Sequence, residues 1–219
     1  MGPLREGLLG DAARLRHRRA RLLDGLLRRY AEGEAAAVAP HVVGRRVLDL
    51  GGGEGYVAAA LRRRTGAWVC AADIGPFRRA GVPFVCYDGA RLPFPAGAFD
   101  TTVLLLTLHH CAQPDGVLDE ALRVTRHRLL VTESVFRNRL DRFWLECLDG
   151  RVNRCRHGGA MPVPLAFRSP AGWQALFASR GLRLRDTRWL GAWWERLVHH
   201  PLLFVLDTPA GTGSGTARR

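Results

Sequence analysis

The feature that most constrains the fold is a short apolar run that ends directly in a glycine-rich turn. The run Val47–Leu50 has the character of a buried strand. Asp49 within it is followed by glycine at alternate positions, namely Gly51, Gly53 and Gly55. Glycine lacks a Cβ and adopts backbone angles that other residues avoid, so a ligand can lie against the main chain itself. The turn therefore predicts a ligand site at the end of a strand in an α/β protein.

Two common nucleotide-binding turns do not match this spacing. The dinucleotide fingerprint G-x-G-x-x-G requires a third glycine for close packing of helix on strand, and that position holds Tyr56. The P-loop requires a lysine after its glycines, and the chain contains no lysine. A dinucleotide and a P-loop triphosphate site are therefore disfavoured.

Further strand-like runs follow in order, each with polar residues where the run ends. Residues 66–73 end at Asp73, and an acid at the tip of the second strand of a doubly wound sheet can accept both hydroxyls of a ribose. Residues 84–89 end in Asp88 and Gly89. Residues 101–110 are a third apolar run, which ends in two histidines. Taken singly, such aspartates are as consistent with turns and helix caps.

In this order and register the chain resembles the class I S-adenosylmethionine-dependent methyltransferases. The resemblance is to their small-molecule branch (methyltransferase type 11, quinone-biosynthesis-like). It is close from Arg46 to Thr132 and looser to Asp207. It implies an α/β, Rossmann-like doubly wound seven-stranded sheet, mostly parallel with the last strand reversed, and helices on both faces.

The resemblance also implies S-adenosyl-L-methionine as the cofactor and a set of residues that hold it. Asp49 would support the turn and the methionine moiety, and Asp73 would bind the ribose. The adenine would lie on Ile74, with Asp88 at its edge. The full set is Asp49, Gly51, Gly53, Gly55, Asp73, Ile74, Asp88, Gly89 and Thr107. Gly52 departs from the family pattern, in which a bulkier residue is more usual.

Catalysis needs no covalent nucleophile or metal in this interpretation, because the cofactor carries an activated methyl group. A base can help if the acceptor loses a proton, and histidine titrates near neutral pH. The candidates are His109 and His110, with Glu133 and His157 as further possibilities. The alternative for either histidine of the pair is a packing or capping role. The predicted substrate-contacting residues are His157, Trp144 and Met161.

The predicted organisation is a helical cap at 1–40, a methyltransferase domain at 41–207 with a substrate lid at about 136–168, and a disordered tail at 208–219. Residues 4–30 are amphipathic, with leucines along one stripe and arginines on the other face. Two interpretations of this segment stay open. It lies over the sheet with a solvated basic face, or it contacts a membrane or gates the cofactor site. Within the lid, residues 136–149 can form a helix, and the prolines and glycines of 151–168 predict an irregular stretch. Ser169 and Pro170 predict the start of a later helix that closes at Gly181.

The net charge of +13 raises the question of nucleic acid, but its composition weakens that hypothesis. All 33 basic residues are arginine, a bias typical of a GC-rich genome, and they are spread along the chain. The Asn/Asp-Pro-Pro-aromatic motif of base-amine methylation, the lysine-containing tetrad of ribose methylation and the Pro-Cys of pyrimidine methylation are all absent. Nucleic acid is therefore disfavoured as a partner.

Three function classes remain. The favoured one is an enzyme that methylates a small aromatic or lipophilic molecule. The others are an RNA or protein methyltransferase, and a non-catalytic module that binds the cofactor or a membrane surface. The five cysteines are scattered without a C-x-x-C pair, and no segment has the apolar length of a membrane span or signal core. We therefore expect a cytoplasmic protein with reduced thiols; the sequence does not indicate its oligomeric state.

Overall fold

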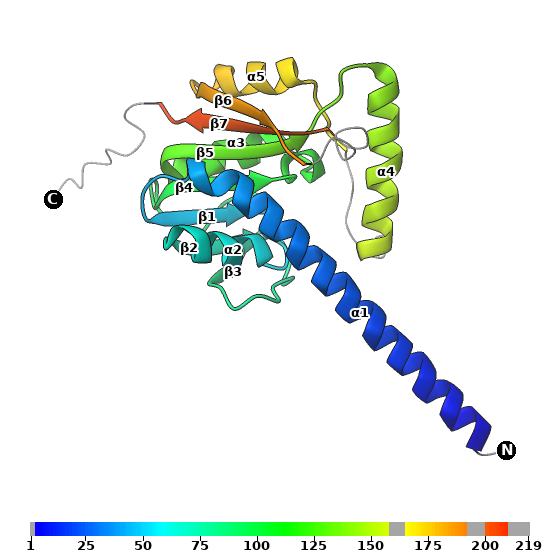
Figure 1. Ribbon diagram of the computed structural model, residues 1–219. Helices are drawn as coiled ribbons and strands as arrows, with labels where there is room; N and C mark the ends of the chain where they lie inside the picture. Colours follow the sequence, from blue (N-terminus) through cyan, green and yellow to red (C-terminus); the bar gives the residue numbers. More distant parts are fainter. Residues whose placement is uncertain (1–2, 158–164, 192–199, 210–219) are drawn as a thin grey trace.

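The structure is a computed structural model that describes residues 3–157, 165–191 and 200–209, with side chains described from residue 21 to 148 in the first range. Figure 1 shows a central sheet with helices on both faces and one long helix that extends away from the domain. The strands are β1 Arg46–Leu50, β2 Trp68–Asp73, β3 Phe84–Cys86, β4 Phe99–Leu105, β5 Thr125–Ser134, β6 Arg183–Trp189 and β7 Pro201–Asp207. The helices are α1 Pro3–Val38, α2 Tyr56–Thr65, α3 Pro114–Val124, α4 Arg139–His157 and α5 Pro170–Ser179, with the short 3-10 helices η1 Ala39–His41 and η2 Leu108–His110.

The seven strands have the order β3-β2-β1-β4-β5-β7-β6. Strands β1 to β5 pair in parallel, whereas β7 lies between β5 and β6 and is antiparallel to both. The predicted α/β sheet, mostly parallel with its last strand reversed, is therefore confirmed. The order reverses between β1 and β4, where the chain winds outward in two directions.

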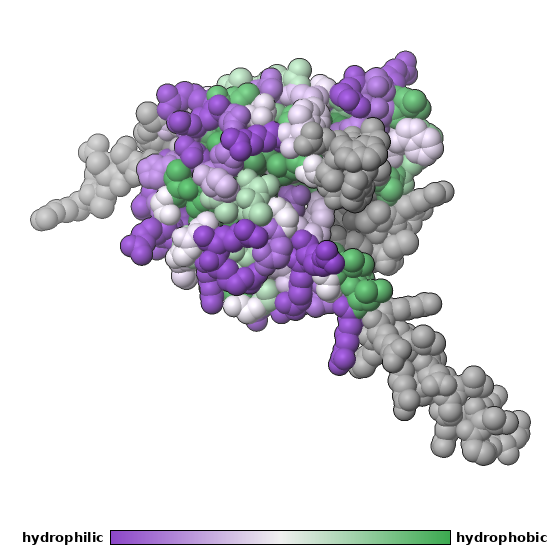
Figure 2. Space-filling model, in the orientation of Figure 1, coloured by the Kyte–Doolittle hydropathy of each residue, from purple (hydrophilic) through white to green (hydrophobic). Residues whose placement is uncertain are grey.

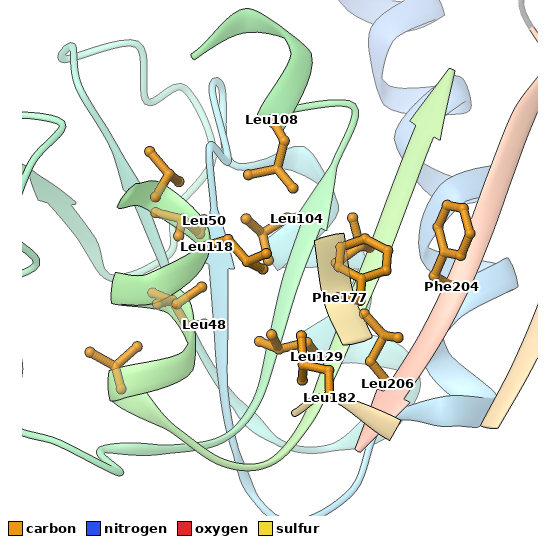
Figure 3. Close-up of a cluster of buried hydrophobic side chains, with 14 of the residues drawn as sticks. Leu48, Leu50, Leu104, Leu108, Leu118, Leu129, Phe177, Leu182, Phe204 and Leu206 are labelled. Atoms are coloured by element: carbon orange, nitrogen blue, oxygen red, sulfur yellow. The ribbon is translucent and has the colours of Figure 1, made fainter. Parts of the chain in front are cut away.

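Two hydrophobic cores hold the layers together. On one face, α3 and α5 pack against the sheet through buried residues such as Leu118 and Phe177, together with Leu48 and Leu129 from the strands. Figure 3 shows part of this cluster, with Phe204 and Leu206 of β7 beside β5. On the other face, α2 and the C-terminal part of α1 pack on the sheet. Burial of both sheet faces explains the near-continuous apolar runs in the central strands.

The helix predicted at Ser169 is present as α5. The Ser169 hydroxyl accepts a hydrogen bond from the backbone N–H of Gly172 at 3.1 Å, and Pro170 occupies the first turn. The helix ends at Ser179, and Gly181 follows with a φ of +70°. The predicted N-cap serine and first-turn proline thus begin this helix as the sequence indicates.

Helix α1 only partly lies on the sheet. Ala31, Ala35 and Val38 near its end are buried against α2, whereas Leu22 and Leu26 are exposed. Figure 1 shows the preceding turns extending beyond the domain. The expectation of a helix laid over the sheet concerned residues 4–30, whereas the buried residues of α1 that the structure describes belong to the stretch that follows, 31–38. Within the described ranges, no helix is both long and apolar enough to cross a membrane.

Helix α4 is longer than the sequence pattern indicated. We expected a helix from Phe136 to Asp149 and an irregular stretch after Arg151, but α4 continues to His157. Residues 158–164 of the predicted lid and 210–219 of the predicted tail lie outside the described residues.

Candidate active site

The residues predicted to bind the cofactor follow the carboxyl ends of β1, β2, β3 and β4. Because the strand order reverses between β1 and β4, the helices that follow these strands lie on opposite faces of the sheet, α2 on one and α3 on the other, and α/β sheets bind ligands at such a switch point. Contacts between the turns show that they meet. Asp73 after β2 bonds to Gly53 after β1, and Gly89 after β3 lies against Ile74. The glycine turn also abuts Thr107 after β4.

The glycine turn is held by the neighbouring strand and is shaped for close approach. The N–H groups of Gly51 and Gly52 both donate to the carbonyl oxygen of Ala72, at 2.8 and 3.2 Å. Gly51 has a φ of +78°, and a Cβ there would lie 2.3 Å from Thr107 Cγ2, so no other residue fits. By contrast, a Cβ on Gly53 would meet nothing within 4 Å. The main chain at Gly53 therefore faces open space, as a cradle for a ligand requires.

Asp73 links the turns after β1 and β2. Its Oδ2 accepts a hydrogen bond from the N–H of Gly53 at 2.8 Å, and its Oδ1 accepts one from the N–H of Ile74 at 2.7 Å. Burial raises the pKa of the carboxyl, while the backbone N–H groups of Gly53, Ile74 and Gly75 act in the opposite direction. Each carboxylate oxygen has a further lone pair. Asp73 can therefore keep the turn in place and still accept ribose hydroxyls.

Asp49 is a buried acid beneath the same turn. Its Oδ2 has no hydrogen-bond partner within the described part of the chain. Burial raises the pKa of its carboxyl to about 7, which the charge of Asp73 reinforces and the N–H of Ala58 opposes. A Cβ on Gly52 would lie 3.0 Å from both this oxygen and the Ala71 Cβ, which accounts for the small residue at that position. A buried acid with an unpartnered oxygen fits a cationic group such as the ammonium of the expected cofactor.

The expected adenine site consists of an exposed apolar side chain beside a glycine. Ile74 is 52% exposed although it is apolar. Gly89 has a φ of +81°, and a Cβ there would lie 3.3 Å from Ile74 Cγ2, so the two residues adjoin. Asp88 Oδ1 accepts hydrogen bonds from the N–H groups of Arg91 and Ala90, both at 2.8 Å, and these bonds lower the carboxyl pKa. Asp88 thus closes its own turn through Oδ1.

His109 and Glu133 form a buried pair next to the turn after β4. The side chains are 2% and 0% exposed, and His109 Nδ1 lies 2.5 Å from Glu133 Oε2. The other carboxylate oxygen accepts from the N–H of Leu108 at 2.7 Å. The imidazole ring stacks on Phe167, with 4.7 Å between ring centroids. His109 is therefore fixed in orientation by a carboxylate and an aromatic ring, as a histidine that positions its neighbour would be.

His110 is the more accessible histidine of the two. It is partly buried, and its ring centroid lies 3.9 Å from that of His109. The next residue, Cys111, was not predicted as part of the site. Burial and the charges of Glu133 and Asp73 raise the pKa of its thiol to about 11, so it is protonated at neutral pH. Cys111 is therefore not an activated nucleophile.

The predicted substrate-contacting residues are only partly described. Trp144 on α4 is 59% exposed, and no described contact joins it to the turns above. His157 ends α4, and its side chain is not described; Met161 lies outside the described residues. The start of α4 is tied to the sheet, since His200 Nε2 next to β7 lies 3.7 Å from Asp141 Oδ2. Among the described residues, no group of three His, Cys, Asp or Glu side chains is arranged to hold a metal.

Phe167 could not have been predicted to join the site. It follows a stretch rich in proline and glycine and comes from a distant part of the chain. The N–H of the preceding Ala166 donates to the carbonyl oxygen of His109 at 2.9 Å, which brings this segment against η2. Neither the spacing nor the type of these residues carries a signal for that contact.

Comparisons with known proteins identify the family of the chain. The family described as "Methyltransferase domain" matches residues 48–128. The demethylmenaquinone methyltransferase of Mycobacterium tuberculosis is 30% identical over 185 residues, which cover 78% of this chain and 76% of that protein.

Among solved structures, a putative methyltransferase in complex with the Haloferax volcanii Trm112 activator superposes with a TM-score of 0.67 at 18% identity, covering 85% of this chain and 93% of that one. The magnesium protoporphyrin IX methyltransferase of Synechocystis, with S-adenosylhomocysteine (SAH) bound, gives 0.58 at 16% identity, covering 83% of each chain. At these identities the two structures show the fold.

Proposed function

Because the chain belongs to the class I S-adenosylmethionine-dependent methyltransferases, we propose that its acceptor is a small aromatic or lipophilic molecule. The enzyme class and the cofactor follow from the family. The acceptor class is supported by the mycobacterial relative, whose named substrate is a lipophilic quinone. It is also supported by α4, which exposes apolar side chains beside the carboxyl edge of the sheet, namely Leu140, Phe143, Trp144 and Leu148.

The described residues fit the cofactor. Asp73 presents two carboxylate oxygens for the ribose hydroxyls, and Ile74 with Gly89 offers an apolar seat for the adenine. The open oxygen of Asp49 and the bare main chain at Gly53 suit the methionine end. When bound, S-adenosylmethionine supplies a methyl group on a positively charged sulfur, so the protein need not generate an electrophile.

The observation that carries the proposed chemistry is the imidazole pair beside this site. In this proposal His110 accepts the proton that an acceptor hydroxyl, or a ring carbon next to one, loses as it is methylated. His109 acts as the positioning residue, because Glu133 and Phe167 fix its ring and the two imidazoles adjoin. The carboxylate of Glu133 also stabilises positive charge on the pair, which favours proton uptake.

Labelled cofactor distinguishes the acceptor classes. The purified protein is incubated with methyl-labelled S-adenosylmethionine and either a demethylated quinol, total RNA or a protein extract. We expect label in the organic-extractable quinol fraction, and much less incorporation by the Asp73→Ala variant. Label that stays with RNA or with protein would overturn the small-molecule proposal while leaving the enzyme class intact.

A further inference from the structure

Helix α1 carries a stripe of exposed apolar side chains. Leu22 is 68% exposed, Leu26 55% and Tyr30 44%, and Leu23 is exposed beside them. An α-helix turns by about 100° per residue, which places these four side chains within about 100° of arc. Isolated exposed apolar residues are ordinary, but a continuous stripe of this kind indicates a contact surface.

The stripe is not the face that packs on the domain. Ala31, Ala35 and Val38 bury the opposite side of α1 against α2, well round the helix from Leu26. A polar contact holds the same packing side, since the hydroxyl of Tyr56 on α2 donates to Asp24 of α1. The helix is therefore anchored with Leu22, Leu23 and Leu26 turned outward.

Helix α4 presents a second apolar face. Leu140, Phe143, Trp144 and Leu148 are exposed, and the rings of Phe143 and Trp144 lie 5.7 Å apart edge to face. Figure 1 shows α4, and the part of α1 that leaves the domain, on the side toward which the parallel strands point. In Figure 2 hydrophobic surface is visible on α4 and where α1 leaves the domain. Both faces therefore flank the edge that holds the active site.

The charge around these faces selects the kind of partner. The chain has a net charge of +13. Arg21 and Arg29 on α1 and Arg139 on α4 are exposed, and they make no ion pair with any side chain that the structure describes. A second copy of such a cationic chain would be repelled, and a stripe of leucines has no complement on a nucleic-acid backbone. Anionic headgroups over an apolar interior match both features.

We propose that the exposed faces of α1 and α4 dock the protein on an anionic lipid bilayer. The leucines and aromatic rings enter the boundary between headgroups and acyl chains, and the flanking arginines contact lipid phosphates. Such docking would place the active-site edge toward the bilayer from which a lipophilic acceptor can be taken. The docking itself needs neither cofactor nor acceptor, so it goes beyond the proposed function.

Vesicle co-sedimentation tests the proposal. The full chain is mixed with vesicles of phosphatidylglycerol or of phosphatidylcholine at about 0.1 M salt. We expect binding to phosphatidylglycerol and at least tenfold weaker binding to phosphatidylcholine. The Leu22→Ser/Leu26→Ser double variant should bind phosphatidylglycerol at least tenfold more weakly, because each leucine loses its apolar transfer energy. Phe143→Ser should weaken it further in combination.

The matched control is Leu184→Ser, which removes an exposed leucine from β6 rather than from these helices. It should bind as the unchanged protein does, and far-UV circular dichroism should show all variants folded. Asp73→Asn should also bind vesicles fully, which separates docking from the enzymatic role. Absence of vesicle binding, or equal loss in the Leu184→Ser control, would overturn the proposal. So would a dimer in sedimentation that the double variant abolishes, because the stripe would then meet a second copy.

Discussion

At the scale of single residues, Asp73 has two tasks that one substitution should separate. Its carboxylate holds the N–H groups of Gly53 and Ile74 and is the expected ribose ligand. We expect Asp73→Ala to weaken binding of SAH about 30-fold or more, since hydrogen bonds to a charged group contribute about 2 kcal/mol each. Calorimetric titration measures this loss. Asp73→Asn, with one acceptor oxygen, should fall between; unchanged affinity in both variants would remove Asp73 from the site.

Asp49 should make stability depend on pH. The folded-state pKa is raised to about 7 from an ordinary value of 3.8. Below pH 3.8 the carboxyl is protonated in both states and nothing is lost. As pH rises from about 4 to 7 the unfolded chain ionises first, so the folded state loses stability up to about 4 kcal/mol, at about 1.4 kcal/mol per pKa unit.

Asp49→Asn removes this penalty. Its free energy of unfolding in urea should exceed that of the unchanged protein at pH 8.5 and match it more nearly at pH 4.5. A gap that is the same at both pH values would show that the buried carboxyl is not the cause. Because a cationic ligand favours the ionised form, cofactor binding by the unchanged protein should also release protons near pH 7.

Glu133→Gln tests the positioning role of the buried pair. Glutamine can still accept from the N–H of Leu108 but leaves His109 without a carboxylate. We expect kcat to fall about tenfold or more while affinity for SAH stays unchanged. Loss of the adjacent negative charge makes an imidazolium less favourable, so the acid limb of the pH–rate profile should move to lower pH. A lower rate with no movement of that limb would indicate a structural role.

At the scale of elements, α5 depends on its first residue. The Ser169 hydroxyl satisfies the N–H of Gly172, and Trp173 and Phe177 then reach the core. Ser169→Ala should cost about 1 kcal/mol of unfolding free energy. Urea unfolding measures it, with Ser179→Ala at the other end as the comparison. Equal small losses in both variants would mean that the cap contributes nothing special.

Elements also differ in how far the sequence predicts them. The turns after β1, β2 and β3 were predictable because each motif is local. A strand end followed within a few residues by a glycine or an acid is visible in the sequence itself. The capped start of α5 was predictable for the same reason. The length of α4 was not predictable. Residues 151–157 lie next to glycines and are rich in arginine, which favours a loop, and yet they continue the helix.

The His109–Glu133 contact shows the other limit of prediction. Both residues were candidates on the basis of strand ends, but their 2.5 Å approach depends on β4 and β5 lying side by side. The stacking of Phe167 depends on a segment still farther along the chain. Likewise, the apolar stripe of α1 was recognisable as a stripe, while its exposure depends on where α2 packs. Contacts between distant segments are the part that spacing cannot supply.

At the scale of the whole molecule, the proposed cofactor site is built from turns that follow four strands. A ligand that binds the folded state alone stabilises it by about 2.7 kcal/mol at 100 times its dissociation constant. We therefore expect SAH at that excess to raise the thermal midpoint by several degrees, as monitored by circular dichroism. NADH, as the control, should leave the midpoint unchanged. A shift with NADH and none with SAH would contradict the site.

The position of β7 sets a condition on how the chain is made. Strand β7 lies between β5 and β6 and pairs with both. The ribosome therefore makes this inner strand after both of its neighbours. A ribosome that has released β6 has not yet produced its partner, and the edge of β5 stays open as well. A nascent chain that stalls before β7 is made would therefore expose two strand edges with unpaired backbone N–H and C=O groups. Chaperones would be expected to bind such a chain.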